Sequence, residues 1–212
     1  GILSPMYPWR YPAAVNQLAQ HGKIGYHTWN EKLKPITGID FQIHETGMLI
    51  LDEADFDVGL NYAKHHQEPM QTSQLLPQHD LQQLNPKISS QFQQALYFPQ
   101  LANIRNPRVL QSISAYLAQH PNVTLYPNCP IQHIQHTHGK IQYIETAQGQ
   151  RHIAEHYVIA TGAWSAAWST CLKRQISVHP VHGQMLLFKT PKNWLPTMCM
   201  NQVMYLIPRQ DG

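Results

Sequence analysis

Charged side chains are scarce in this chain of 212 residues. Asp, Glu, Lys and Arg make up 13% of the sequence, and the formal net charge is +3 with the 14 histidines neutral. Lys and Arg are scattered and form no basic stripe, which argues against binding to nucleic acid. Hydrophobic residues make up 42% of the chain, and this share argues against a disordered protein.

Cysteine and long apolar runs are also scarce. The three cysteines, Cys129, Cys171 and Cys199, include no CxxC pair, so they indicate the reducing cytoplasm rather than a disulfide scaffold. The apolar run at residues 48–51 is among the longest, whereas a membrane-spanning helix needs about 20 such residues. The sequence therefore predicts a cytoplasmic protein with no membrane span.

Two signatures of cofactor binding and catalysis are missing. No two of the 11 glycines are separated by a single residue, so the phosphate-binding GxGxxG loop does not occur in this chain. A GxSxG nucleophile turn is absent as well. Histidine is abundant, and His133, His136 and His138 lie close together. On a strand, His136 and His138 would share one face and His133 would point to the other, so a solvated hairpin explains them better than a metal site.

Apolar periodicity and the positions of proline and glycine predict alternating helices and strands. Asn106 is the expected N-cap of the clearest helix, with Pro107 at its first position and Pro121 beyond its end. Helices are expected over residues 12–34, 53–66, 79–84, 106–120 and 163–172. Strands are expected as a pair around Gly47 within 39–51, as two short strands or one bent strand in 95–105, and at 122–126. Further strands are expected as a hairpin over 131–145 turning at His138-Gly139, at 157–160, and in several pieces of 176–209.

This order of elements predicts an α/β protein of two domains that exchange the chain. Residues 106–162 have α/β character and lie between strand-rich flanks. Thr161-Gly162 follows the predicted strand 157–160, and doubly wound folds bind ligands at such junctions, although an ordinary strand-to-helix turn explains it equally well. The chain begins with Gly1 rather than Met and ends in what reads as a hairpin turn, so we expect it to be part of a longer protein.

Six segments, in order along the chain, resemble motifs of one enzyme family. They are GILSPMYPWRY (1–11), NIRNPRVL (103–110), TLYPNCPI (124–131), VIATGAWS (158–165), PVHGQML (180–186) and YLIPRQDG (205–212). Together they resemble the FAD-dependent amino-acid oxidoreductases of the D-amino-acid oxidase superfamily. The likeness is strongest to the glycine oxidases of thiamine biosynthesis.

The resemblance implies an α+β substrate domain joined to part of a Rossmann-like FAD-binding domain. Residues 1–105 would belong to the substrate domain and include the start of the flavin loop. Residues 106–172 would form part of the FAD-binding domain, and residues 173–212 would supply strands to the substrate domain. The family's N-terminal βαβ unit and its C-terminal flavin loop have no counterpart in the chain, which the resemblance therefore identifies as a central fragment.

Six positions match family residues that contact the cofactor: Gly1, Ile2, Ile131, Thr161, Gly162 and Trp164. By this match the first two would lie where the flavin loop passes the isoalloxazine ring, and the backbone of Ile131 would contact the adenine. The last three would lie beside the pyrophosphate and the ribityl chain. Ile131 has a plainer interpretation as a core residue of a strand, and Thr161-Gly162 as an ordinary strand-to-helix turn.

Tyr205 matches a tyrosine whose hydroxyl orients the substrate carboxylate, although an aromatic strand residue more often simply packs on its sheet. The implied reaction is FAD-dependent oxidation of glycine or a small D-amino acid to an imine, which hydrolyses to a 2-oxo acid, with peroxide release. FAD is the implied cofactor and a small amino acid the implied partner, and the longer protein could be homo-oligomeric. No side-chain acid or base is assigned a catalytic role.

Two alternatives remain at this point. A sarcosine oxidase or a D-amino-acid dehydrogenase would share the family but differ in substrate or electron acceptor. A truncated, non-catalytic binding module, or a His-rich metal-binding module, would belong to a different class.

Overall fold

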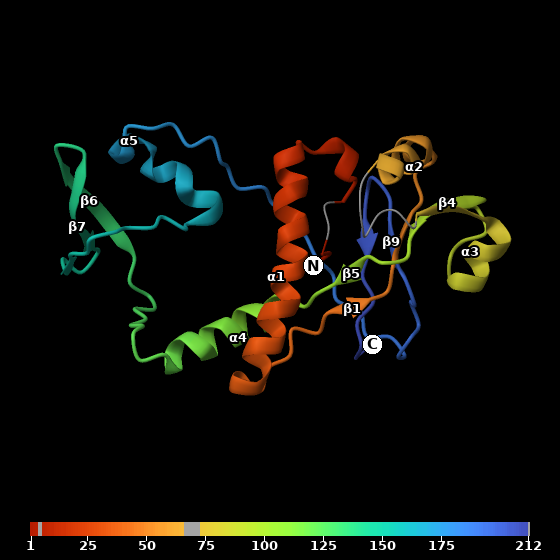
Figure 1. Ribbon diagram of the computed structural model, residues 1–212, viewed down its shortest axis with the longest axis horizontal. Helices are drawn as coiled ribbons and strands as arrows, with labels where there is room; N and C mark the ends of the chain where they lie inside the picture. Colours follow the sequence, from red (N-terminus) through yellow and green to blue (C-terminus); the bar gives the residue numbers. More distant parts are fainter. Residues whose placement is uncertain (4–5, 66–72, 212) are drawn as a thin grey trace. The chain divides into compact units, whose positions relative to one another are not determined.

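The computed structural model describes residues 1–3, 6–65 and 73–211, and its contacts divide the chain into two compact units (Figure 1). Unit 1 comprises Gly1–Val123 and Phe188–Gly212, and unit 2 comprises Thr124–Leu187. The described residues include both helices and strands. The α/β class predicted from the sequence is therefore confirmed.

A five-stranded sheet in the order β10-β9-β2-β4-β3 forms the centre of unit 1. β2 and β9 are parallel, with Met48 opposite Met198, and the other neighbours are antiparallel. The strands are β2 (Met48–Ile50), β3 (Gln74–Pro77), β4 (Gln94–Phe98), β9 (Met198–Met200) and β10 (Tyr205–Leu206). The sheet thus joins the early part of the chain to its last residues.

The two faces of this sheet pack against different helices. Met48 and Ile50 lie in one buried cluster with residues of α2, whereas Leu49 lies in another with α3, as side-chain alternation along a strand requires. The helices beside the sheet are η1 (Pro8–Arg10), η2 (Glu53–Asp55), α2 (Phe56–His65) and α3 (Gln78–Leu84). The helices predicted over 53–66 and 79–84 are confirmed, except that residue 66 lies outside the described residues.

A second core of unit 1 lies between two long helices and a two-stranded sheet. Leu33 of α1 and Ala102 of β5 are buried in this cluster, and Ile113 of α4 packs against it. The elements are α1 (Ala13–Thr37), α4 (Asn106–Gln119), β1 (His44–Glu45) and β5 (Ala102–Asn103). Because α4 packs here, unit 1 extends beyond the boundary predicted at residue 105. The assignment of residues to substrate and FAD-binding domains stays a prediction.

α1 continues through Pro35, so the prediction that it ends before this residue is wrong. Proline removes one main-chain hydrogen bond, and here the loss falls in the last turn. That turn is closed by Gly38, which adopts a left-handed φ of 70° and donates its N–H to the Lys34 carbonyl at 2.9 Å. The Thr37 hydroxyl adds a bond to the Leu33 carbonyl at 2.9 Å.

Unit 2 contains a hairpin, a third short strand and a helical segment. The hairpin turns at His138 and Gly139, whose φ values of 49° and 77° suit a two-residue turn, so the predicted hairpin is confirmed. His138 lies in the turn and not on a strand, so the argument that it shares a face with His136 is wrong. The elements are β6 (Ile131–Thr137), β7 (Lys140–Thr146), β8 (Arg151–His152), η3 (Gly162–Trp168) and α5 (Ser169–Leu172).

Several predicted strands do not form. Residues 122–126 and 157–160 have no strand structure, and residues 175–191 form neither helix nor strand. A strand needs a neighbour for its N–H and C=O groups, and within the described residues none pairs with these segments. Val158 is 89% exposed, contrary to the buried strand predicted there. In the last predicted region, 176–209, the strands that form are β9 and β10.

Two local predictions differ from the structure in their pairing or position. β1 and β2 flank Gly47 but pair with β5 and with β4 and β9 rather than with each other. Arg105, not Asn106, takes the N-cap position of α4, with extended φ and ψ of −93° and 90°. Asn106 is instead the first helical residue. The helix itself and the two short strands in residues 95–105 are confirmed.

Candidate functional site

The first residues of the chain are fixed against β5. Ile2 forms an antiparallel bridge with Asn103, and the N–H of Ile104 donates to the Gly1 carbonyl at 2.9 Å. A Cβ atom on Gly1 would lie 2.5 Å from Oδ1 of Asn106, so a side chain there would displace the Asn106 side chain. The backbone matched to the flavin loop is therefore held in place, and its glycine has a packing role of its own.

A buried polar cluster lies directly behind this segment. Asn103 is 1% exposed; its amide donates to the His44 carbonyl at 3.3 Å and to the Thr46 hydroxyl at 3.2 Å. Arg209 completes the cluster by donating to Oδ1 of Asn103 at 3.3 Å and to the Ile104 carbonyl at 3.2 Å. Sequence reasoning gave no role to Asn103 or Arg209, although both lie in quoted motifs.

Tyr205 lies on the edge strand β10, opposite Met200 of β9. Directly opposed residues point to the same face of a sheet, so Tyr205 shares the face of Met200 and Met48. Met200 is 3% exposed, whereas Tyr205 is 43% exposed. Its side chain is therefore accessible to a ligand, while its backbone belongs to the same sheet as β2.

The segment matched to the pyrophosphate region lies at the start of η3 in unit 2. The N–H of Trp164 donates to the Thr161 carbonyl at 3.1 Å, and the Ser165 hydroxyl bonds to the Gly162 carbonyl at 2.8 Å. Thr161 and Ser165 share a hydroxyl hydrogen bond of 3.1 Å. These contacts bring Thr161, Gly162 and Trp164 together in one exposed turn.

Ile131, matched to the adenine contact, is the first residue of β6 and pairs with Thr146 of β7. It is half-buried, and beside it the N–H of Ala147 donates to the Pro130 carbonyl at 2.9 Å. The structure therefore places Gly1, Ile2 and Tyr205 in unit 1 and the other matched residues in unit 2. The roles of all of them remain predictions.

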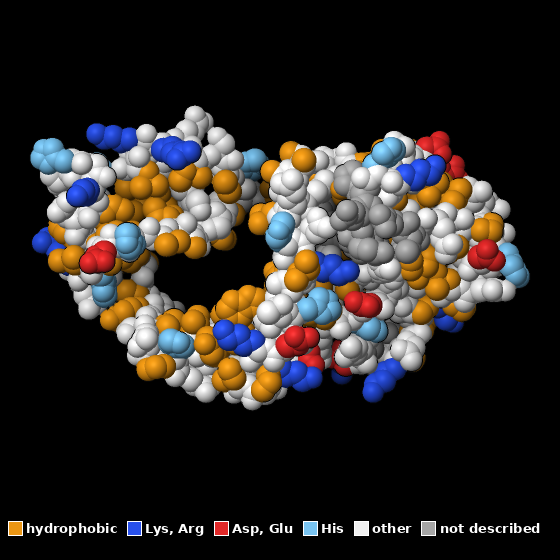
Figure 2. Space-filling view, in the orientation of Figure 1, with side chains coloured by type: hydrophobic (Ala, Val, Ile, Leu, Met, Phe, Trp, Pro, Cys, Tyr) orange, Lys and Arg blue, Asp and Glu red, His pale blue; other side chains and the backbone are white. Residues whose placement is uncertain are grey.

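The exposed turn of unit 2 fits a large ligand with phosphate groups and an apolar ring system. Gly162 has a φ of 55°, and no atom lies within 4 Å of the position a Cβ would take, so its backbone is open to close approach. Trp164 is 71% exposed and offers an aromatic face. Exposed hydrophobic side chains gather on this unit (Figure 2), and they include Ile153, Val158, Trp164, Leu172, Val181, Met185, Leu186 and Leu187. The open backbone of Gly162, the aromatic face of Trp164 and this apolar surface together fit a cofactor such as FAD, which has phosphate groups and a large ring system.

Comparison with protein families shows to which family the chain belongs. All of residues 1–212 match the DAO family, described as FAD dependent oxidoreductase. The chain belongs to this family. The cofactor of the DAO family is FAD, so the family and cofactor inferred from the six motifs are confirmed.

Two relatives of the chain within the DAO family are glycine oxidases of pseudomonads. The chain is 37% identical to the glycine oxidase of Pseudomonas putida and 33% identical to that of Pseudomonas aeruginosa, over 212 residues in each case. Both alignments cover all of this chain and 57% of the relative, so the chain spans little more than half the length of these proteins. A further relative, at 25% identity, is the bifunctional protein ThiO/ThiG of Synechocystis.

A solved structure shows the same fold. The glycine oxidase of Geobacillus kaustophilus superposes with a TM-score of 0.86 at 23% identity, over all of this chain and 57% of that one. This agreement shows that the chain shares the fold of the corresponding part of that protein.

Two features of the described residues bear on other classes of function. None of the helices in residues 1–3, 6–65 and 73–211 is long and apolar enough to cross a membrane. Over the same ranges, no group of three or more His, Cys, Asp or Glu side chains is placed to hold a metal ion.

Proposed function

We propose that the protein containing this chain oxidises glycine or a small D-amino acid with FAD and releases peroxide, supplying the imine or 2-oxo acid for thiamine thiazole synthesis. The identity of 37% to a glycine oxidase along the whole chain carries this proposal. The relative named bifunctional protein ThiO/ThiG supports the link to thiamine. A small amino acid is the proposed substrate, and the cytoplasm is the proposed location.

The residues of unit 1 would bind and orient the substrate. The hydroxyl of Tyr205 is accessible and would donate to the substrate carboxylate, which fixes the direction of Cα. The segment at Gly1 and Ile2 is held by β5, so its backbone would form a rigid wall of the site. Positioning of this kind lowers the barrier by removing the entropy cost of alignment. FAD, when bound, supplies the two-electron oxidation.

In unit 2, the open backbone at Gly162 and the exposed side chains of Thr161 and Trp164 would hold the phosphate and ribityl part of FAD. The half-buried Ile131 would contribute its backbone to the adenine. No proton transfer by a side chain is part of this proposal. Loss of hydride from the substrate Cα to FAD would therefore depend on orientation and on exclusion of water rather than on a catalytic acid or base.

The decisive experiment measures peroxide release by the FAD-loaded protein with glycine, sarcosine and D-alanine as substrates. We expect the highest kcat/KM with glycine or D-alanine. A clear preference for sarcosine would make the protein a sarcosine oxidase. Reduction of an artificial electron acceptor without peroxide would make it a dehydrogenase. A tight, stoichiometric zinc site in calorimetry, without any amine oxidation, would favour the metal-binding alternative.

A further inference from the structure

The carboxylate of Asp52 connects two segments of unit 1 that are far apart in sequence. Asp52 follows β2, and its two oxygens accept hydrogen bonds from different partners. The hydroxyl of Tyr7 donates to Oδ2, and the backbone N–H of Gln202 donates to Oδ1 at 3.2 Å. Tyr7 lies 45 residues before Asp52, and Gln202 lies 150 residues after it.

Tyr7 provides a rigid end to this connection. It is 7% exposed, its ring meets Trp9 edge-on at 5.8 Å, and the Arg10 guanidinium lies 4.1 Å from its centroid. Burial raises the pKa of Tyr7, and the hydrogen bond to Asp52 raises it further. The hydroxyl therefore stays protonated and donates to Asp52 throughout the physiological pH range.

The other end is the turn that leads into β10. The Asn201 N–H donates to the Met204 carbonyl at 2.9 Å, and Oδ1 of Asn201 accepts from the N–H groups of Val203 and Met204 at 3.0 and 2.9 Å. These bonds are internal to the turn, and Val203 is 85% exposed. The bond from Gln202 to Asp52 ties the middle of the turn to the segment after β2, next to the Leu51 N–H, which donates to the Met200 carbonyl at 2.9 Å. β10 is two residues long and pairs with β9, and Arg209 anchors the chain after it, so the bond to Asp52 is the contact that acts on β10 from the side of the turn.

We infer that Asp52 is a positioning residue for Tyr205. Its carboxylate, fixed by Tyr7, holds the turn from Asn201 to Met204 and so sets where the Tyr205 side chain meets the substrate carboxylate. This inference rests on the proposed function, in which the Tyr205 hydroxyl binds the substrate. Asp52 itself touches neither substrate nor cofactor and acts through the turn.

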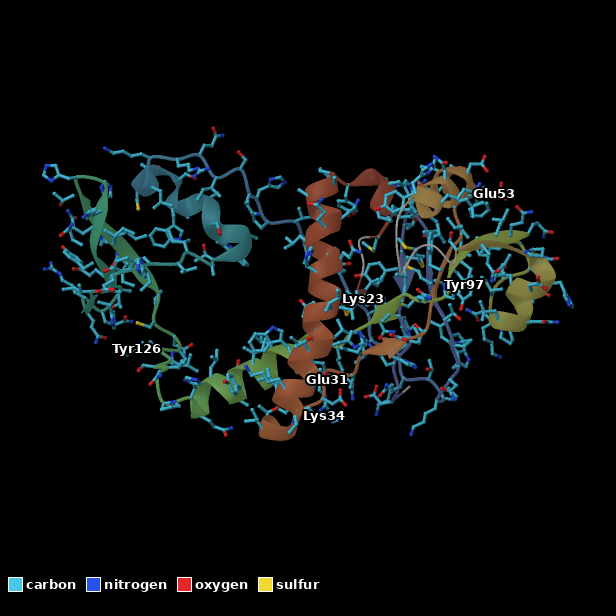
Figure 3. All side chains as sticks on the ribbon, viewed as in Figure 1. Lys23, Glu31, Lys34, Glu53, Tyr97 and Tyr126 are labelled. Carbon is cyan, nitrogen blue, oxygen red and sulfur yellow. The ribbon has the colours of Figure 1, made fainter. Side chains whose placement is uncertain are left out.

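The test measures binding of acetate, which is glycine without its amine and cannot be oxidised, to the FAD-loaded protein by the change in flavin absorbance. Asp52→Ala removes both hydrogen bonds and should weaken acetate binding by about tenfold, the loss expected for one misplaced charged hydrogen bond. Asp52→Asn keeps an acceptor for Gln202 and a donor for the Tyr7 oxygen, so it should restore most of the affinity. Glu53, labelled in Figure 3, is the exposed neighbour, and Glu53→Gln is the matched control for loss of one negative charge.

A double-mutant cycle separates positioning from a general loss of stability. In the Tyr205→Phe background, Asp52→Ala should weaken acetate binding by less than about twofold, because the group it positions is already gone. Equal losses in both backgrounds, or unchanged acetate binding in Asp52→Ala, would overturn the inference.

A second variant is used if Asp52→Ala loses its flavin. Tyr7→Phe releases the same carboxylate without a change of charge, and it should weaken acetate binding in the same direction. Unchanged affinity in Tyr7→Phe would overturn the inference as well. If Tyr205→Phe alone has no effect on acetate, the proposed role of Tyr205 fails instead.

Discussion

Tyr205 presents its hydroxyl from an edge strand, and this hydroxyl is the clearest candidate for a substrate contact in unit 1. Tyr205→Phe removes one hydrogen bond to a charged group, which is worth about 1.5–3 kcal/mol. We expect the KM for glycine to rise by about one to two decades, with flavin content unchanged. Tyr11 has a similar exposure of 44%, and Tyr11→Phe is the control that should leave KM unchanged. An equal KM in wild type and Tyr205→Phe would return Tyr205 to a structural role.

The glycines of two helices in unit 1 should respond oppositely to substitution. In α2, a Cβ on Gly59 would lie 2.3 Å from the Leu96 side chain and 2.9 Å from that of Trp9. Gly59→Ala should therefore destabilise the protein by about 1–3 kcal/mol. In α1, no atom lies within 4 Å of such a position on Gly22, so Gly22→Ala should stabilise by about 0.5–1 kcal/mol. Urea unfolding measures both, and changes of the same sign would show that the packing of α2 is misjudged.

Cys199 should be the least reactive of the three thiols. Burial raises its pKa from 9.0 to about 11, whereas Cys129 and Cys171 are half-buried. Because the thiolate is the reacting form, a thiol reagent at pH 8 should modify Cys129 and Cys171 first and Cys199 after unfolding. The raised pKa also means that stability contributed by the neutral thiol is lost as pH rises from 9.0 to about 11. Labelling followed by mass spectrometry tests this order, and equal rates in the native protein would contradict it.

At the scale of elements, the hairpin of unit 2 depends on two left-handed residues. Gly139 has a φ of 77°, so Gly139→Ala should cost about 1–2 kcal/mol, whereas His138→Asn places a residue that favours this region and should stabilise the turn. Hydrogen exchange at the amides of β6 and β7 measures local opening. Gly183→Ala is the matched control, because its φ is not left-handed and no atom lies within 4 Å. Faster exchange in the Gly183 variant than in the Gly139 variant would contradict this account.

Elements with local signals were predictable, and those with distant partners were not. The helix at Asn106–Gln119 follows from Pro107 and its apolar face, and the hairpin follows from its turn residues. By contrast, the parallel pairing of β2 with β9 depends on residues far apart in sequence. The apolar run at 157–160 predicted a strand because periodicity cannot show whether a neighbouring strand is present.

At the scale of the molecule, the contacts of the candidate site that join distant segments were likewise not predictable from the sequence. Gly1, Gly162 and Tyr205 are predicted as site residues through short motifs, because a glycine or tyrosine in a fixed sequence context can be matched residue by residue. Asp52 and Arg209 act through hydrogen bonds that span 150 and 106 residues. In the sequence, Asp52 and Arg209 look like ordinary charged residues. Their partners become visible only in the structure, where the sheet of unit 1 brings the distant segments together.

Unit 2 carries many exposed apolar side chains for a folded domain. Leu186 and Leu187 are 78% and 79% exposed, and Val158 of the same unit is 89% exposed. Contiguous exposed apolar surface favours association with another surface. A polypeptide limited to residues 1–212 should therefore self-associate.

The same polypeptide should not retain FAD. In dinucleotide-binding folds the pyrophosphate is held by backbone N–H groups of a Gly-rich turn and the helix that follows it. Residues 1–212 contain no GxG at any position, so the contacts at Gly162 would act without that turn. We expect this polypeptide to purify colourless, to elute from size-exclusion chromatography as oligomers, and to be inactive towards glycine. A control protein that carries the GxGxxG unit of a glycine oxidase ahead of Gly1 should recover the visible absorbance of an oxidised flavin. A yellow monomer of residues 1–212 with equimolar flavin would show that unit 1 and unit 2 hold the cofactor through contacts other than those proposed.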